Sequence, residues 1–227
     1  MMKTYIELME NSKIINMIQI LENGSKKEKT ITIEDFLASL TSSIEGKTFV
    51  EAKSPIFRTK NGCRLIQTKT IGPKATIYVL VSEKCRMPIQ FFNRFYDNVG
   101  IPALIYGIHV VNNRLVKIYV VATKEIDVTD DTELYIYPFT NVNGYKGQAC
   151  LGRNSFPNGI ENNNCEALYD VPRQFICMPN NLDYYHATNN TMCYEAEELI
   201  KSLRNKDFDD NLLVEHKITY KQWFNSL

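Results

Sequence analysis

Four segments of strand length and strand-like composition dominate the middle of the chain, and short polar turns join them in pairs. Turns of two or three residues can connect antiparallel strands, whereas parallel strands need a long crossover. Glycine, proline and asparagine, which occupy these turns, are favoured where the backbone reverses. The pattern predicts a mostly antiparallel sheet. Its strands are expected at Cys63–Ile71, Ala75–Ser82, Ala103–Val111 and Leu115–Thr123, with a further strand at Thr132–Tyr137.

Helices are predicted at three places after residue 51. Residues Pro88–Val99 carry apolar side chains at spacings of three and four, the pattern of a helix that packs one face on a sheet. Gly100 and Pro102 follow, as expected where a helix ends. Residues Thr191–Asn205 and Thr219–Ser226 have the same apolar spacing near the C-terminus.

The first fifty residues are predicted to form a small extension. An apolar strand over Ile14–Leu21, an Asn23-Gly24 turn and a second strand over Thr30–Ile33 indicate a hairpin. A short helix is expected over residues 33–40, where acids come first and apolar side chains follow at helical spacing. We therefore expect a hairpin-helix extension over residues 1–50 and the main domain over residues 51–227.

Charge and composition exclude two broad classes of protein. The chain has 26 basic and 26 acidic residues and is 44% hydrophobic. A nucleic-acid-binding domain usually carries a surplus of lysine and arginine. A disordered chain combines low hydrophobicity with high net charge. Neither description fits, so we expect a folded protein without a nucleic-acid partner.

The N-terminal residues, the length of the apolar runs and the spacing of the cysteines indicate where the protein is located and whether it forms disulfides. Residues Met1–Glu7 include polar side chains and an acid where a secretory signal needs an unbroken apolar stretch. No apolar run approaches the roughly 18 residues that a membrane-spanning helix requires. The sequence predicts a cytoplasmic protein with no membrane partner. Its six cysteines are far apart in the chain and are expected to be free thiols.

The segment 138–164 differs from the rest of the chain, because its apolar residues show little periodicity and it is rich in Asn, Gly and Pro. Long irregular segments within a compact domain are often functional. Cys150 lies here between Gly147 and Gly152, and glycines leave a neighbouring thiol accessible. The thiolate is the nucleophilic form of cysteine. Lys146 and Arg153 are close to Cys150 in the sequence, and their positive charges could favour the thiolate. The spacing leaves open whether Cys150 is reactive or structural.

Several motifs in the chain resemble those of a known family. The residues Phe139-Thr140-Asn141-Val142, followed by Gly147-Gln148-Ala149-Cys150-Leu151, resemble the active-site signature of ubiquitin-conjugating enzymes, although Phe139 and Thr140 replace its His and Pro. The resemblance is closer to the prokaryotic family-D conjugating enzymes, which include the PRTRC system protein B group, and spans roughly residues 50–200. Its other motifs are Pro55-Ile56, Gly100–Leu104, Asp131–Tyr135, Tyr137-Pro138, Gly152 and Tyr185–Thr188.

This resemblance implies an α+β fold of the ubiquitin-conjugating type and an acyltransferase activity. Cys150 corresponds to the cysteine that accepts a ubiquitin-like protein as a thioester from an adenylating activating enzyme. Asn141 falls near the family's Asn, whose amide stabilises the oxyanion formed during transfer, and the alternative is that it only ties down the loop. His186 lies in a family motif, and two roles stay open for it: to orient or deprotonate the attacking amine, or to form structural hydrogen bonds. The implied partners are the ubiquitin-like protein, the activating enzyme and a metalloprotease of the deubiquitinating type.

Two other functions remain open from the residues themselves. The first is a scaffold or binding module of the same fold, with an inactive Cys150, in a plasmid-associated or defence-associated complex. The second is a thiol hydrolase that uses Cys150 with His186 and an acid such as Asp183 or Asp170. No cofactor is predicted, because the chain lacks a Gly-rich phosphate-binding loop. No metal site is predicted either, because the spacing of Cys165, Cys177, His186 and Cys193 matches no structural zinc motif.

A plain conjugating fold contains an uninterrupted meander of four strands after its first helix. The predicted helix at Pro88–Val99 separates two pairs of strands here. The sequence leaves open whether the strands before this helix are an elaboration or the meander itself is interrupted.

Overall fold

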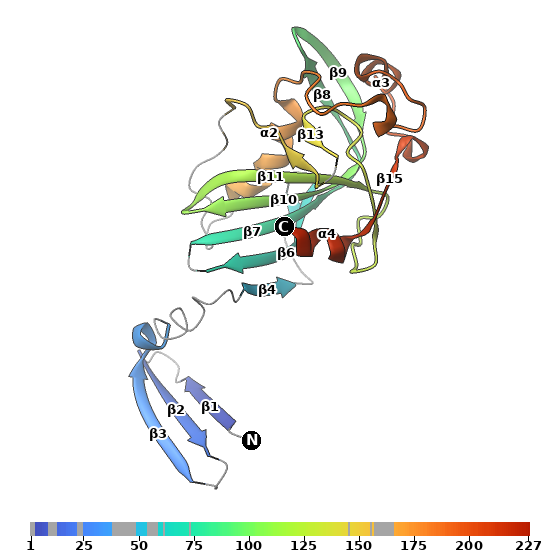
Figure 1. The fold of residues 1–227 in the computed structure, drawn as a ribbon. Coiled ribbons are helices and arrows are strands. Elements are labelled where there is room, and N and C mark those ends of the chain that lie inside the picture. Colours follow the sequence, from blue (N-terminus) through green and yellow to red (C-terminus); the bar gives the residue numbers. More distant parts are fainter. Residues whose placement is uncertain are drawn as a thin grey trace. The chain divides into compact units, whose positions relative to one another are not determined.

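A computed structural model of the chain describes residues 3–8, 13–21, 25–37, 49–53, 59–60, 62–72, 74–144, 146–154, 156 and 166–227. The chain forms two compact units, Met1–Phe49 and Val50–Leu227 (Figure 1). Some predicted features lie outside the described residues. They are the Asn23-Gly24 turn, the last three residues of the helix expected over residues 33–40, the Pro55-Ile56 motif and Cys165.

The smaller unit contains a three-stranded antiparallel sheet in the order β1 (Lys3–Leu8), β2 (Ile14–Ile20) and β3 (Lys26–Thr32). The sequence predicts the β2–β3 hairpin but not β1, which pairs along β2. Its apolar residues Tyr5 and Ile6 are both exposed, so β1 lacks the alternation that marks a half-buried strand. Residues 33–37 are helical, and the Thr32 hydroxyl caps them by accepting a hydrogen bond from the Asp35 N–H.

The larger unit is built on a mostly antiparallel sheet whose central strands confirm the four predicted segments. These strands are adjacent in the order β11 (Arg114–Thr123), β10 (Ala103–Val111), β7 (Ala75–Ser82) and β6 (Cys63–Ile71). Short strands extend both edges. They are β4 (Phe49–Lys53) and β5 (Thr59–Lys60) beside β6, β13 (Val142–Asn143) and β14 (Gln148–Ala149) beyond β11, and β12 (Glu133–Tyr135) with β15 (Glu215–Thr219).

Helices and loops cover both faces of this sheet. Along β10, Tyr106 and Ile108 enter one core, which includes Phe175 of helix α2 (Val171–Cys177), while Ile105 enters the other. The second core contains the fully buried Trp223 of helix α4 (Tyr220–Ser226). Successive residues of a strand point to opposite faces, so a strand buried on both sides carries a nearly continuous apolar run. This explains the strongly apolar sequence of β7 and β10.

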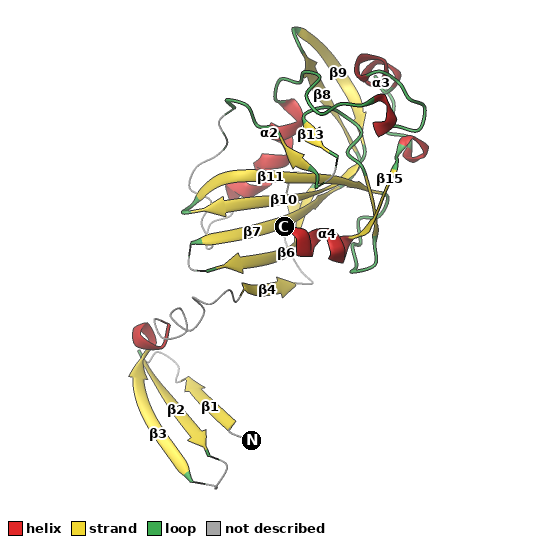
Figure 2. Ribbon diagram, in the orientation of Figure 1, coloured by secondary structure: helices red, strands yellow, loops and turns green. Residues whose placement is uncertain are grey.

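The predicted helix at Pro88–Val99 is wrong, and this stretch forms a β-hairpin instead. Strands β8 (Cys85–Phe91) and β9 (Arg94–Ile101) pair with each other, and a turn with a positive φ at Phe92 joins them (Figure 2). Pro88 is tolerated because the hairpin forms a separate two-stranded sheet. The helical pattern depends on Phe92 and Phe95, yet both side chains are exposed. The meander β6-β7-β10-β11 is therefore interrupted by this hairpin.

The C-terminal half contains short helices joined by long loops. Helix α3 (Ala196–Ser202) is shorter than predicted, because Glu195 and Glu198 form a capping box that begins it at residue 196. The final helix is confirmed, with Thr219 at its N-cap. Helix α2 was not predicted. Over the described residues, no helix combines the length and apolar character that crossing a bilayer requires.

Candidate active site

Cys150 lies directly after β14, the short strand that pairs with β11 near one edge of the sheet. The backbone of β14 is fixed there, because Gln148 pairs with Tyr119 and the Val120 N–H donates a hydrogen bond of 2.6 Å to the Gly147 carbonyl. The Cys150 N–H itself donates to the Asn141 carbonyl at 2.8 Å. The side chain is half-buried rather than enclosed. The sheet edge therefore holds the Cys150 backbone in place and leaves the thiol within reach of solvent.

Asn141 connects this edge to the segment that follows helix α2. Its side chain is buried, and the amide nitrogen donates hydrogen bonds to the Pro179 carbonyl at 3.2 Å and to Asn180 Oδ1 at 3.4 Å. Its backbone has a φ of 64°, a conformation that Asn tolerates better than most residues. The backbone of Asn141 is thus hydrogen-bonded to that of Cys150, while its side-chain amide is hydrogen-bonded to residues 179 and 180.

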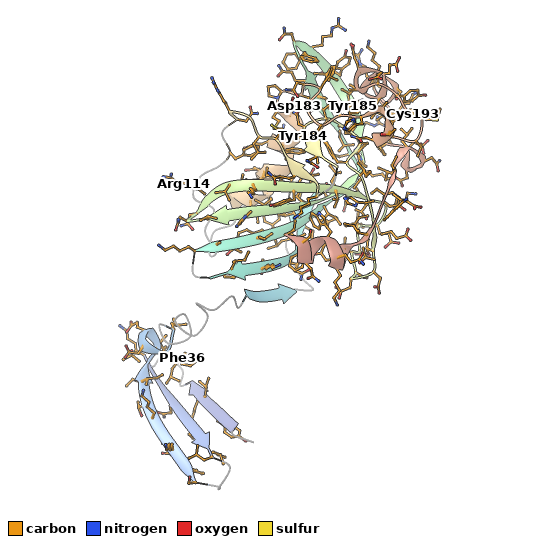
Figure 3. All side chains as sticks on the ribbon, viewed as in Figure 1. Phe36, Arg114, Asp183, Tyr184, Tyr185 and Cys193 are labelled. Carbon is orange, nitrogen blue, oxygen red and sulfur yellow. The ribbon has the colours of Figure 1, made fainter. Side chains whose placement is uncertain are left out.

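Asp183 is the acid that the structure places closest to the thiol. The Cys150 thiol donates a long hydrogen bond to the carboxylate, with Sγ and Oδ2 4.0 Å apart. Asn181 holds the same carboxylate oxygen through its Nδ2 at 2.9 Å, and the Asn141 N–H donates to the Asp183 carbonyl at 2.8 Å. Figure 3 shows Asp183 and Tyr184 at the end of the larger unit near β8 and β9. Among the described residues, no cation pairs with Asp183.

Sequence reasoning considered Asp183 only as part of a hydrolase, because 33 residues separate it from Cys150. The local signal was the Asn181-Leu182-Asp183 sequence, in which the Asp183 N–H donates to Asn181 Oδ1 at 2.7 Å. Such Asx turns place a side chain firmly but do not reveal what it faces. Only the pairing of residues 141 and 183 across the fold brings this acid to the thiol.

His186 lies three residues beyond Asp183, just before the turn of 3₁₀ helix at Ala187–Asn189. Its side chain is exposed. Within the described part of the chain, no hydrogen bond joins the His186 imidazole to Cys150 or to Asp183. The structure therefore brings Cys150, Asn141 and Asp183 into one connected site, and it places His186 near this site along the chain without a contact to the thiol.

The described thiols differ in their surroundings. Burial raises the pKa of the Cys63 thiol to about 12 and that of Cys85 to about 11, and it also raises the pKa of Cys177. Cys150 is half-buried, and Cys193 is exposed. Because the thiolate is the reactive form and the raised pKa values of Cys63 and Cys85 leave almost none of it at pH 7, we expect iodoacetamide to modify Cys150 and Cys193 at least about tenfold faster than these two.

Peptide mass spectrometry of a time course would measure these rates residue by residue. The Cys85 rate should rise about tenfold per pH unit between pH 7 and 9, because its thiolate fraction rises by that factor below the pKa. Equal rates at the buried Cys63 and the half-buried Cys150 would contradict the access of solvent to the Cys150 thiol.

The contacts of Asn141 predict a measurable structural role. The Asn141→Ala variant loses buried hydrogen bonds and places alanine at a positive φ. We expect it to lower the free energy of unfolding by roughly 2–3 kcal/mol, measured by urea denaturation. The control Asn211→Ala changes an exposed asparagine and should stay within about 0.5 kcal/mol of wild type. Equal midpoints for the two variants would mean that Asn141 does not hold the loop.

Comparison with known proteins identifies the family. A family model described as prokaryotic E2 family D matches residues 58–216, which is more than half of the chain and includes Cys150, Asn141, Asp183 and His186. No curated protein and no solved structure matches significantly. No group of three or more His, Cys, Asp or Glu side chains in the described ranges is arranged to hold a metal. The chain belongs to prokaryotic E2 family D, the conjugating-enzyme-like family that its motifs resemble.

Proposed function

We propose that this protein is a conjugating enzyme that carries a ubiquitin-like protein as a thioester on Cys150 and transfers it to an amine. The observation that supports this most directly is the half-buried Cys150, held at the sheet edge with the Asp183 carboxylate 4.0 Å from its sulfur, in a chain of family D. A nucleophile with one nearby acid and few other groups suits this chemistry. A thioester is already activated toward amines, so orientation supplies much of the rate.

Two acyl transfers make up the proposed reaction. In the first, the Cys150 thiolate attacks the activated C-terminal carbonyl of the ubiquitin-like protein, which the activating enzyme holds as a thioester. A new C–S bond forms, and the thiolate of the activating enzyme leaves. In the second, the nitrogen of an acceptor amine attacks the carbonyl, an amide bond forms, and the C–S bond to Cys150 breaks. The amine loses one proton, and the thiolate of Cys150 is restored.

We assign Asp183 a role in the second transfer. Its carboxylate lies beside the sulfur, carries no paired cation in the described structure and is oriented by Asn181. An incoming amine can therefore donate a hydrogen bond to this carboxylate while its nitrogen faces the thioester carbon. The predicted roles of Asn141 as oxyanion donor and His186 as amine-orienting residue stay predictions. In this structure the Asn141 amide is bonded to residues 179 and 180.

Family membership supports the partners of this proposal. We infer an adenylating activating enzyme and a ubiquitin-like protein as its reaction partners, and a deubiquitinase-like metalloprotease that reverses the modification. The PRTRC association and a cytoplasmic location belong to the same proposal. Genes adjacent to that of this protein would provide the candidate partners for testing it.

The test of the proposed function is intact mass spectrometry. Wild-type protein, Cys150→Ala and Cys150→Ser are each mixed with ATP, the neighbouring activating enzyme and the candidate ubiquitin-like protein. We expect an adduct on wild type that a reductant removes, and no adduct on Cys150→Ala. The serine variant is expected to form a reductant-resistant ester, because an ester is less reactive toward thiols than a thioester.

Two outcomes would favour the rival functions. With an activating enzyme shown to charge itself, the absence of any adduct on wild-type protein would support the scaffold interpretation. A thiol hydrolase would instead cleave an isopeptide-linked substrate and lose that activity in His186→Ala. A conjugating enzyme should still be charged on Cys150 in the same variant.

A further inference from the structure

A pocket of about 520 Å³ lies between the tip of the β8–β9 hairpin and the start of helix α3. Sites of roughly 300–1,000 Å³ are typical for bound small groups, so an aromatic or branched aliphatic side chain fits here. The apolar part of its wall includes Phe92, Leu182 and Ala196, and the polar part includes Arg94, Glu195 and Glu197. We call this the hairpin pocket.

The hairpin pocket and the proposed active site share the segment 180–183, which supplies residues to both. Leu182 in its wall is the residue immediately before Asp183, whose carboxylate lies 4.0 Å from the Cys150 sulfur. The hairpin is tied to the same segment, because the Phe92 N–H donates to the Asn180 carbonyl at 2.8 Å and the Asn180 N–H donates to the Gln90 carbonyl at 2.9 Å. The pocket wall therefore includes the residue that directly precedes the acid in contact with the thiol.

Two large apolar side chains of the pocket remain open to solvent. Phe92 is 51% exposed and Leu182 is 54% exposed. Phe92 reaches this position because of its positive φ of 50°, and its ring packs edge-on against the buried Phe91. A positive φ is unfavourable for a bulky residue and is often found at functional sites. The turn thus holds an aromatic ring at the pocket instead of burying it.

The charges around the pocket indicate which molecule it receives. Glu197 is neutralised by Arg94 at 2.5 Å and by Lys201 at 3.0 Å. Asp183 and Glu195 have no cation within ion-pair distance among the described residues. Two carboxylates that no described cation neutralises, one in the pocket wall and one directly after Leu182, complement a segment that carries both a positive charge and an apolar side chain. A donor C-terminus has lost its charge once it is a thioester, whereas an acceptor lysine still carries one as it approaches.

We propose that the hairpin pocket selects the acceptor: a polypeptide segment with an aromatic or branched aliphatic side chain two to four residues from the lysine that is modified. This inference rests on the proposed conjugating function. An extended chain advances about 3.3–3.6 Å per residue. Because Leu182 directly precedes Asp183, we expect a lysine beside Asp183 to bring a side chain at this spacing to Leu182 and Phe92.

In the test, Cys150 is loaded by chemical thioester exchange, so no activating enzyme is needed. A synthetic peptide with a C-terminal glycine thioester is exchanged onto Cys150, and the adduct is quantified by intact mass. Single-lysine acceptor peptides of ten residues are then added. Six of them carry one Phe at two, three or four positions before or after the lysine, and the reference peptide carries Ser throughout. The measured quantity is the rate of amide formation.

We expect at least one Phe peptide to react about tenfold faster than the Ser peptide on wild-type protein. The ratio of the Phe-peptide rate to the Ser-peptide rate should fall close to one in Phe92→Ser and Leu182→Ser. It should persist in the control Phe95→Ser, which removes an aromatic side chain from the same hairpin but not from the pocket wall. Thermal melting by circular dichroism confirms that each variant is folded.

The outcomes separate this inference from the proposed function. Failure of the glycine thioester to load Cys150, while the activating enzyme also yields no adduct, overturns both. Normal loading with equal rates for all seven peptides overturns acceptor selection and leaves conjugation intact. If Phe92→Ser and Leu182→Ser slow loading and leave the peptide preference unchanged, the pocket holds the donor and the inference is wrong.

Discussion

The Asp183→Asn variant is expected to charge Cys150 at the wild-type rate and to transfer the acyl group to lysine about 100-fold more slowly. The substitution keeps the size of the side chain and one oxygen that can accept from Asn181. It removes the negative charge beside the sulfur, and hence the group that accepts the proton of the attacking amine. Loss of general-base assistance typically costs about 10²–10⁴ in rate.

Single-turnover discharge of the preformed thioester to free lysine measures this step separately from loading. The matched control is Asp127→Asn, which removes the same charge from an exposed acid that pairs with Arg64. It should discharge at the wild-type rate. If Asp183→Asn and Asp127→Asn discharge equally fast, Asp183 has no part in transfer, and the 4.0 Å contact is only structural.

The Gly147→Ala variant is expected to lose about 3 kcal/mol of unfolding free energy and to displace Cys150. Gly147 has a φ of 73°, and a Cβ there would lie 2.3 Å from the Val120 carbonyl oxygen. Overpacking against backbone costs about 1–3 kcal/mol, and a positive φ adds about 1–2 kcal/mol for alanine. The strand β14 that precedes Cys150 has to move away from β11, so charging should fall as well.

Gly144→Ala is the matched control for this variant, since it lies in the same loop and its Cβ would meet no atom within 4 Å. Urea denaturation should show wild-type stability for Gly144→Ala and a lower midpoint for Gly147→Ala. Identical midpoints would show that residue 147 has room for a side chain, contrary to the close approach to β11.

Much of the sheet was predictable because local sequence determines it. The strands β7 and β10 are nearly continuous apolar runs, β6 and β11 are rich in strand-forming residues, and turn residues separate all four, so their positions follow from residue types alone. The final helix was predictable for a similar reason, because Thr219 and Gln222 form a local capping box. Cys150 was identified from its flanking glycines and from motifs that lie within ten residues of it.

The hairpin β8–β9 shows where the same reasoning failed. Apolar residues at 89, 92, 96 and 99 fit a helix by spacing, and residues at 87, 89 and 91 fit a strand equally well. A short apolar run does not decide between the two periods. Tertiary contacts favour the hairpin over a helix. Ile89, Tyr96 and Val99 are buried in the core, and the Phe92 N–H donates to the carbonyl of Asn180, which is distant in the sequence.

The sequence alone therefore determined the four central strands of the sheet, the reactive position of Cys150 as a hypothesis and membership of a conjugating family as a resemblance. Tertiary structure decided what surrounds the thiol. Asp183 meets Cys150 only because the Asn141 N–H and carbonyl bond to residues 183 and 150, and the hairpin pocket exists only because β8 pairs with residue 180. These contacts depend on backbone groups, which every residue possesses, so the sequence carries no specific signal for them.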